Sequence, residues 1–286
     1  MTASGFADPR YLITPQDLSA RFSEVVLIDL RPAEDFALGR IEGARHLDLY
    51  GISLNDSAEA PLNAFLGIFP TLFGARGVTH EKPVVIYDHE SGERASRAVW
   101  LLALLGHADV RMLDGGTRAW VASGRALARV TQAPPHPDPA TTPPTPPPFK
   151  ANIKLDFVAT RFDVHGAIDD AGAVIVDVRR ASEYRGDEKR ARRAGTIPGA
   201  EHVFWRDHLD GNGAFKPPQE MRRLYESKGV TPDKSVITVC HGGYRSASTF
   251  LALKSLGYPR VRNYVSSWGE WGNRDDSRIV VPNTDR

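Results

Sequence analysis

Cysteine is almost absent from this sequence: among 286 residues there is one, Cys240. A lone cysteine cannot form a disulfide within the chain and cannot supply a multi-cysteine metal site. A free thiol persists most readily in a reducing compartment, so we expect a cytoplasmic location. Any thiolate chemistry has Cys240 as its one candidate nucleophile.

Long apolar runs and an excess of either charge are also missing. No stretch approaches the ~20 apolar residues that a membrane span requires, and the first eleven residues contain no apolar run that would predict a signal peptide. Lys and Arg total 36 against 35 for Asp and Glu. Because nucleic-acid binding usually shows as a basic excess, we expect neither a nucleic-acid nor a membrane partner. The locally basic segment 187–193 is interpreted as a solvated surface loop.

Proline, by contrast, is concentrated in one place. Residues 131–149 contain nine of the 21 prolines. Such a run cannot supply the hydrogen bonds of a helix or a central strand, and it favours extended polyproline geometry. We therefore predict a semi-rigid linker at 131–149 between two domains, residues 1–130 and 150–286.

The two predicted domains repeat each other. The matching segments are 25–31 with 173–179, 39–44 with 195–200, 84–88 with 236–240, 110–113 with 261–264, and 118–120 with 269–271. Five landmarks in the same order indicate a duplication. In both halves, short runs rich in Val and Ile alternate with helical patterns. This alternation predicts the α/β class, with a mostly parallel sheet in each domain and helices on both faces.

The most informative segment runs from Cys240 to Arg245. Cys240 ends a predicted strand, and a helix is predicted to begin near Ser246. Gly242 and Gly243 allow successive N–H groups to turn inward around one point, and the helix start adds further free N–H groups. With the charge of Arg245, this cradle should lower the thiol pKa below ~8.5. The alternative, a small buried apolar cysteine, requires neither the glycines nor the arginine.

This loop resembles the active-site loop of the rhodaneses, in which a cysteine opens a six-residue loop of pattern Cys-x-x-Gly-x-Arg or Thr. Segments 177–179, 195–200 and 267–272 are also similar to that family, and the resemblance to two-domain thiosulfate sulfurtransferases covers nearly the whole chain. It implies two rhodanese-like domains and a Cys240 that carries sulfur as a persulfide. The sulfur would pass from thiosulfate, a small anionic donor, to cyanide or a thiol, including a protein thiol. Neither a metal nor an organic cofactor is required.

The resemblance also implies a set of substrate-binding residues beside the catalytic Cys240. They are His241, Gly242, Gly243, Tyr244 and Arg245 of the loop, together with Asp177 and Arg179. For Asp177 and Arg179, a buried ion pair at the strand end is an equally good interpretation. In the first half, Asp88 takes the place of the cysteine, so that half is expected to be inactive and to shape one wall of the cleft.

Two positions depart from the family pattern. Glu183 stands where some relatives have a substrate-binding arginine, and Gly242 stands where the vertebrate thiosulfate enzymes have a lysine. Residues 265–267 also read Val-Ser-Ser in place of Asp-Gly-Ser. Because of these departures, the substrate contacts and the turn geometry of the family cannot be carried over directly to this sequence.

Related functions remain open alternatives. A 3-mercaptopyruvate sulfurtransferase typically has the loop Cys-Gly-Ser-Gly-Val-Thr, from which His241 and Arg245 both depart. A persulfide relay would use the same Cys240 persulfide with a protein as donor or acceptor. Rhodanese-fold phosphatases place five residues between cysteine and arginine, whereas four separate Cys240 from Arg245. The shorter loop favours a sulfur atom over a phosphoryl group.

Overall fold

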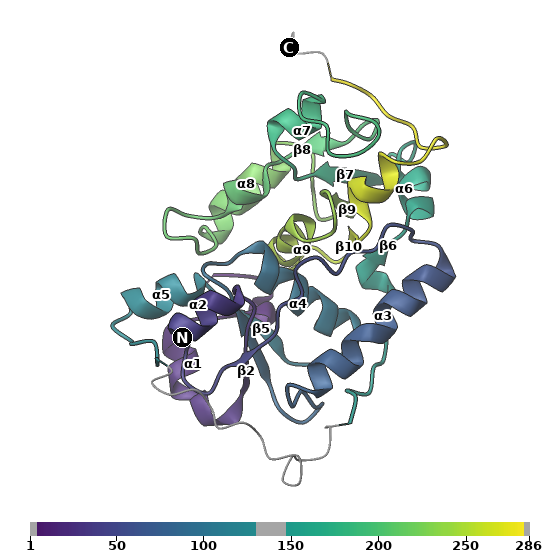
Figure 1. Cartoon of the computed structure of the whole chain (residues 1–286). Coiled ribbons are helices and arrows are strands. Elements are labelled where there is room, and N and C mark those ends of the chain that lie inside the picture. Colours follow the sequence, from purple (N-terminus) through teal and green to yellow (C-terminus); the bar gives the residue numbers. More distant parts are fainter. Residues whose placement is uncertain (1–4, 130–146, 283–286) are drawn as a thin grey trace.

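The computed structural model describes residues 5–129, here called the first half, and residues 147–282, the second half. Figure 1 shows them as two α/β units that meet along one interface. The predicted linker at 131–149 lies outside the described residues as far as position 146. Within the described ranges, none of the helices has both the length and the apolar character needed to cross a membrane.

The first half is built on five parallel strands in the order β1-β5-β4-β2-β3. Its elements are η1 (Pro9–Tyr11), β1 (Leu12–Ile13), α1 (Pro15–Ala20), η2 (Phe22–Glu24), β2 (Val26–Asp29), α2 (Ala33–Leu38), β3 (Arg45–His46), α3 (Glu59–Gly74), β4 (Val84–Tyr87), α4 (Glu93–Leu104), β5 (Val110–Leu113) and α5 (Gly116–Ala122). Helix α1 starts at a proline that follows a capping threonine. The Thr14 hydroxyl accepts a hydrogen bond from the Asp17 N–H at 3.1 Å.

The second half repeats this arrangement strand for strand, in the order β6-β10-β9-β7-β8. Its elements are η3 (Leu155–Phe157), β6 (Val158–Ala159), α6 (Arg161–Ala167), β7 (Ala173–Asp177), α7 (Ala181–Arg185), β8 (Glu201–His202), η4 (Trp205–His208), α8 (Pro218–Glu226), β9 (Ser235–Val239), α9 (Arg245–Ser255), β10 (Val261–Tyr264) and α10 (Ser267–Trp271). All its strands are parallel. The predicted α/β class and the duplication are therefore confirmed.

Both faces of each sheet are buried, which explains the continuous apolar runs of the central strands. Side chains alternate between the faces along a strand. In the first half, Ile28 and Ile86 contribute to the large apolar cluster shared by the two halves, whereas Leu27 and Val85 contribute to a smaller cluster on the opposite face. The second half follows the same rule, with a separate outer cluster of its own.

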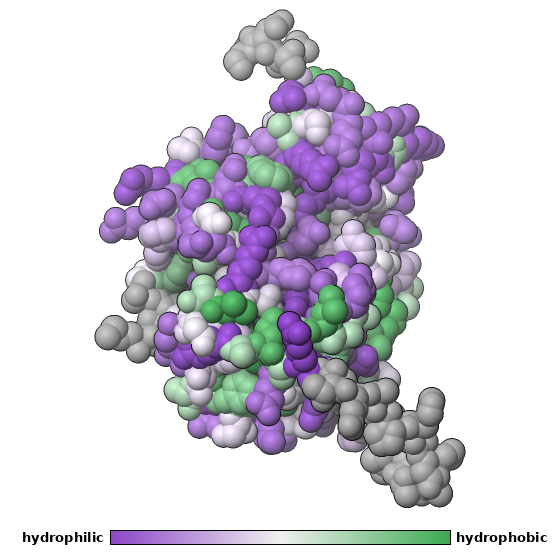
Figure 2. All heavy atoms as spheres, turned by 60° about the vertical axis from the view of Figure 1, so that its left-hand side comes forward, coloured by the Kyte–Doolittle hydropathy of each residue, from purple (hydrophilic) through white to green (hydrophobic). Residues whose placement is uncertain are grey.

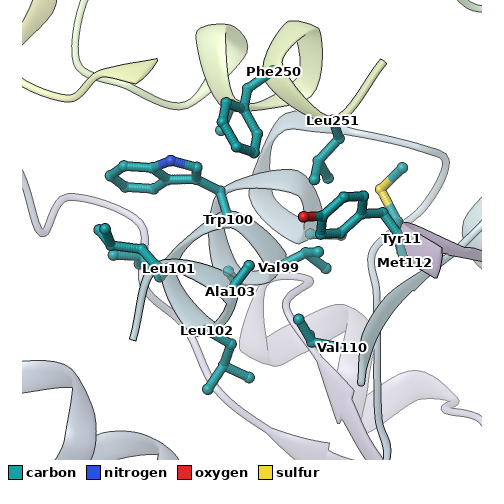
Figure 3. Packing of buried hydrophobic residues seen from close by; sticks show 14 of the residues in the cluster. Tyr11, Val99, Trp100, Leu101, Leu102, Ala103, Val110, Met112, Phe250 and Leu251 are labelled. Carbon is teal, nitrogen blue, oxygen red and sulfur yellow. The ribbon is translucent and has the colours of Figure 1, made fainter. Parts of the chain in front are cut away.

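Helices α4 and α9, which occupy equivalent places in the two repeats, pack against each other at the interface (Figure 1). Figure 3 shows Phe250 and Leu251 of α9 facing the α4 residues Val99 and Trp100. The Trp100 indole N–H donates to the Phe157 carbonyl at 2.9 Å. One apolar core therefore extends through both halves.

The end of the predicted linker and the residues that follow it run along the first half. Phe149 is buried, and its N–H donates to the Pro70 carbonyl at 2.9 Å. The Asn152 N–H then donates to the Leu105 carbonyl at 2.8 Å. These bonds attach the second half to the first before its own sheet begins.

The surface differs between the halves on the face drawn in Figure 2. Hydrophilic side chains cover most of the upper part, which is the second half, and apolar side chains gather lower down. The basic segment 187–193 is exposed or half-exposed along its length, as predicted. One of its residues, Arg190, nevertheless borders a cavity described below.

Replacing Trp100 by alanine should destabilise the whole protein. Trp100 is 0% exposed, and loss of a buried tryptophan typically costs about 3–5 kcal/mol. Denaturant unfolding monitored by circular dichroism measures this change. Val121→Ala serves as the control, because Val121 is 51% exposed and its truncation should cost no more than about 0.5 kcal/mol. A loss below about 1 kcal/mol for Trp100→Ala would contradict a shared core.

Candidate active site

Cys240 lies where the carboxyl end of β9 meets the loop before α9, a position at which parallel α/β sheets commonly bind ligands. It directly follows Val239, the last residue of the strand, and α9 begins at Arg245, one residue earlier than predicted. The cysteine is 1% exposed. Its place at the sheet edge agrees with the prediction from sequence.

Hydrogen-bond donors surround the Cys240 sulfur, and two of them are close to it. The Gly243 N–H lies 3.1 Å from Sγ, and the Ser246 hydroxyl lies 3.3 Å from it. Gly243 has a φ of +81°, and a β-carbon there would come within 2.5 Å of the Val265 carbonyl oxygen, so glycine is required. Burial acts to raise the pKa of Cys240, but the charge of Arg245 and hydrogen bonds from Ser246 and Gly242 outweigh it, and the pKa lies below its ordinary value. The loop is therefore the predicted anion cradle.

Ser267 holds the cradle from the neighbouring loop, a role that the sequence analysis did not predict. Its hydroxyl accepts a hydrogen bond from the Cys240 N–H at 3.0 Å and donates to the Tyr264 carbonyl at 2.6 Å. Ser267 has a φ of +51°, unusual for any residue other than glycine, and Gly116 occupies the equivalent place in the first half with a φ of +55°. Residues 265 and 266, which depart from the family pattern, thus directly precede a strained residue beside the thiol.

The guanidinium of Arg245 has a different binding partner from the one expected. The sequence predicted that it would face the thiolate and an incoming anionic donor. Instead Nη1 and Nη2 donate to the two carboxylate oxygens of Glu183, at 2.6 and 3.0 Å. The departure at Glu183 explains this outcome, because a carboxylate there offers Arg245 a bidentate partner inside the protein.

The Glu183 carboxylate is 1% exposed and lies between two arginines. Arg190 approaches the same carboxylate at 3.6 Å. Burial acts to raise the pKa of Glu183, but the hydrogen bonds and charge of Arg245 prevail and lower the pKa to about 2. Glu183 is therefore ionised at neutral pH and offsets part of the positive charge beside the sulfur.

Asp177 and Arg179 form the buried ion pair that was one of their two predicted roles. Their side chains meet at 2.6 Å, and Arg179 also donates to the Gly195 carbonyl at 2.7 Å. The first half, which has no cysteine, contains the same pair: Arg31 meets Asp29 at 2.6 Å. Neither Asp177 nor Arg179 lines the cavity beside Cys240, and the contact that the structure shows for them is this ion pair within the fold.

A cavity of about 220 Å³ opens over the sulfur between the two halves. The second half contributes the lining residues Arg190, Cys240, His241, Gly242, Tyr244 and Arg245, and the first half contributes Tyr50, Gly51, Ser53 and Glu93. The predicted loop residues thus come together, with Gly243 presenting its N–H to the sulfur from behind. Sequence reasoning missed Arg190 and the four residues of the first half. It did predict that the first half would form one wall.

His241 and Tyr244 differ in how they are held. The Tyr244 hydroxyl donates to the Leu49 carbonyl at 2.7 Å, which anchors the loop to the first half. The Nδ1 atom of His241 is buried and has no partner among the described residues. Burial, followed by the charges of Arg190 and Arg245, lowers the pKa of His241. The imidazole is therefore neutral at pH 7.

The loop at Asp88 shows what the same fold does without a cysteine. The Asp88 carboxylate accepts the N–H groups of Glu90, Gly92 and Ala95 at 3.0, 3.3 and 3.1 Å. Burial raises the pKa of Asp88 to about 6, although these bonds oppose the increase. The donors that would cradle an external anion are thus used by the protein's own carboxylate.

The fold and the site define a tandem α/β protein with one thiol in an N–H cradle at the end of a parallel strand. Two segments of the chain, residues 14–123 and 161–274, match the Rhodanese-like domain family. The chain therefore belongs to the rhodanese family and contains its domain twice.

Similar proteins extend over nearly the full length. A thiosulfate sulfurtransferase of Azotobacter vinelandii is 36% identical over 278 residues, which cover 96% of this chain and 99% of that protein. A protein of the same name from Pseudomonas aeruginosa is 36% identical, covering 97% and 100%. The sulfur carrier protein TtuD of Thermus thermophilus is 32% identical, covering 94% and 96%.

Two solved structures have a fold similar to that of this chain. The anaerobic ergothioneine biosynthesis enzyme from Chlorobium limicola superimposes with a TM-score of 0.79 at 20% identity, covering 96% of this chain and 71% of that one. YnjE superimposes with a TM-score of 0.77 at 20% identity, covering 97% and 70%. At this identity the likeness concerns the arrangement of the chain alone.

The ion pair between Glu183 and Arg245 should stabilise the fold in a pH-dependent way. Because folding lowers the Glu183 pKa from its ordinary 4.5 to about 2, the stabilisation is complete above about pH 5 and is lost as the pH falls through 4.5 towards 2. The difference in unfolding free energy between the parent and Glu183→Gln should therefore shrink as the pH is lowered. Urea denaturation between about pH 7 and pH 3.5 measures it. A difference that stays constant with pH would contradict an ionised, paired Glu183.

Proposed function

We propose that this protein is a sulfurtransferase that moves sulfane sulfur from thiosulfate to cyanide or another thiophilic acceptor through a Cys240 persulfide. The observation that carries the proposal is the single thiol, aimed at a small cavity and hydrogen-bonded by Gly243 and Ser246. The full-length relatives named thiosulfate sulfurtransferase support the choice of donor.

The first half-reaction loads the enzyme. The Cys240 thiolate attacks the outer sulfur of thiosulfate and forms a new S–S bond. The sulfur–sulfur bond of thiosulfate breaks, and its electron pair leaves with sulfite. The N–H and O–H donors around Sγ stabilise the attacking thiolate because they are already oriented towards it.

The second half-reaction unloads the enzyme. The acceptor attacks the outer sulfur of the persulfide, the bond to Sγ breaks, and the Cys240 thiolate returns. Since the chain has one cysteine, no second thiol of its own can discharge the persulfide. A covalent intermediate of this kind implies ping-pong kinetics.

The donor would lie in the 220 Å³ cavity. We propose that His241, Gly242 and Tyr244 contact it there, with Arg190 and Arg245 supplying positive charge. Because Glu183 already occupies the guanidinium of Arg245, the half-exposed Arg190 is better placed to receive the donor's oxygens.

A second candidate is a sulfur relay with a protein donor or acceptor. The relative named sulfur carrier protein TtuD favours it, and the same Cys240 persulfide would serve both reactions. A 3-mercaptopyruvate donor is less well supported, because Glu183 stands where some relatives have an arginine that could bind the carboxylate of such a substrate. We also propose a cytoplasmic location and domain limits of 1–130 and 150–286.

Replacing Cys240 by serine should abolish turnover and persulfide formation together while leaving the fold intact. Intact-mass measurement after incubation with thiosulfate, mercaptopyruvate or neither detects the added sulfur directly. Asp88→Asn is the matched substitution in the other repeat, and the turnover rate of this variant should stay within a few-fold of the parent's. A sulfur gain by Cys240→Ser would refute the mechanism, whereas a loss of ~10²-fold in Asp88→Asn would give the first half a catalytic part.

Removing Arg245 should lower the rate with thiosulfate more than it lowers the rate at which an uncharged reagent alkylates Cys240. A charge-assisted contact contributes roughly 1.5–3 kcal/mol, or about 10- to 150-fold in rate. The comparison is made in Glu183→Gln, so that Arg245→Ala leaves no unpaired carboxylate. Alkylation by an uncharged reagent at high pH should change much less, and Arg245→Lys should restore only part of the thiosulfate rate. Equal losses with thiosulfate, mercaptopyruvate and the neutral reagent would show that Arg245 merely braces the loop.

A further inference from the structure

A buried guanidinium without an acidic partner lies directly behind the Cys240 loop. It belongs to Arg97 on α4, in the half that has no cysteine, and it is 1% exposed. The groups that act on its charge among the described residues are Tyr244 and Cys240, and no carboxylate is among them. A buried charge ordinarily has a partner of opposite sign, because desolvation strongly disfavours it. Arg97 therefore requires an explanation beyond packing.

Among the residues that the structure describes, Arg97 contacts neutral groups. Nη1 donates to the Gly242 carbonyl at 2.8 Å, and Nη2 donates to the Ile52 carbonyl at 2.9 Å. The guanidinium carbon lies 4.0 Å from the centre of the Tyr244 ring. Nε has no partner among the described residues. These contacts satisfy donors of the side chain, but none of them neutralises its charge.

One of these contacts continues to the sulfur. The Gly242 carbonyl and the Gly243 N–H belong to the same peptide unit, and that N–H donates to Sγ at 3.1 Å. Arg97 thus binds one end of the peptide whose other end binds the cysteine. Hydrogen bonds linked in this way polarise one another. The fit is close, because a β-carbon at Gly243 would lie 2.7 Å from the Arg97 Nη1.

We propose that Arg97 is a positioning residue for Cys240, and that the anionic sulfur is the counter-charge that its guanidinium otherwise lacks. Arg97 would fix the 242–243 peptide with its N–H on Sγ and would favour the thiolate and then the persulfide anion. The inference rests on the proposed function, since it requires Cys240 to react as an anion. It adds a role in the site for the half that has lost its cysteine.

Arg97 differs from the other charged groups around the sulfur in its direction of approach. Those groups are Arg245 at the start of α9, His241 in the loop, Arg190 and Glu183 beside Arg245, and Glu93 at the start of α4. All of them except Glu183 line the cavity, and Arg97 does not. Its replacement can therefore change the thiol without removing a contact to a donor in the cavity.

The test is the pKa of Cys240, obtained from the pH dependence of alkylation by iodoacetamide and read by intact mass. Because Cys240 is the one cysteine, the modification is unambiguous and needs no sulfur donor. Arg97→Met should raise the thiol pKa by about one unit or more, a tenfold loss of thiolate below the pKa. Arg97→Gln keeps a donor for Gly242 without the charge and should give an intermediate value. Arg97→Lys should lie close to the parent.

The control is Arg94→Gln, on the same helix. Arg94 pairs with Asp48 at 3.1 Å, and loss of this solvent-screened charge should shift the thiol pKa by less than about 0.3 unit. An unchanged pKa in folded Arg97→Met or Arg97→Gln would overturn the inference even if turnover persisted. Failure of Cys240 to gain sulfur would instead overturn the proposed function alone.

A second measurement covers the case in which neither neutral variant folds. If Arg97 favours the thiolate, the thermal stability of the parent relative to Cys240→Ser should increase as the pH rises from the lowered pKa of the folded thiol to the ordinary pKa of the unfolded one. The same comparison in Arg97→Lys should show a similar increase. A stability difference that does not vary with pH would overturn the inference.

Discussion

The packing of α4 against α9 is the contact on which the rest of the structure depends. Each helix starts at the loop that follows the central strand of its own sheet, so joining the helices brings the loops of Asp88 and Cys240 to one interface. The apolar core becomes continuous through Trp100 and Phe250. Because the catalytic loop ends on a helix that is itself buried, its N–H groups cannot drift away from the sulfur without disturbing that core.

The two repeats have used the same loop in opposite ways. Around Cys240 the donors face a sulfur that borders a cavity, whereas around Asp88 they are satisfied by the internal carboxylate. The Asp88 loop serves instead as a docking surface: Glu90 pairs with Arg206 at 2.5 Å, and the Ser91 N–H donates to the Gly213 carbonyl at 2.7 Å. The Asp88 loop thus helps to hold the two halves together.

The parts of this structure that could be predicted from sequence are those fixed by local pattern. Strand runs, the repeat, the loop at Cys240 and the capped start of α1 all depend on residues close together in the chain. Arg97, Arg190 and Ser267 could not be found in this way, because each reaches the loop from a different element. The Glu183 substitution was visible in the sequence. Its consequence was not, since the pairing with Arg245 spans 62 positions.

Charge compensation, more than the number of arginines, sets the field at the sulfur. Arg179 is neutralised by Asp177 and Arg245 by Glu183, while Arg97 has no carboxylate among the described residues. The groups that contact Sγ directly are dipoles, among them the Gly243 N–H and the Ser246 hydroxyl. Such dipoles are oriented before reaction and need little reorganisation as negative charge moves between Sγ and the outer sulfur. In a site that accepts an anion, holds it as a persulfide and then releases it, these dipoles contact the sulfur directly, while the charge of Arg97 acts on it through the 242–243 peptide.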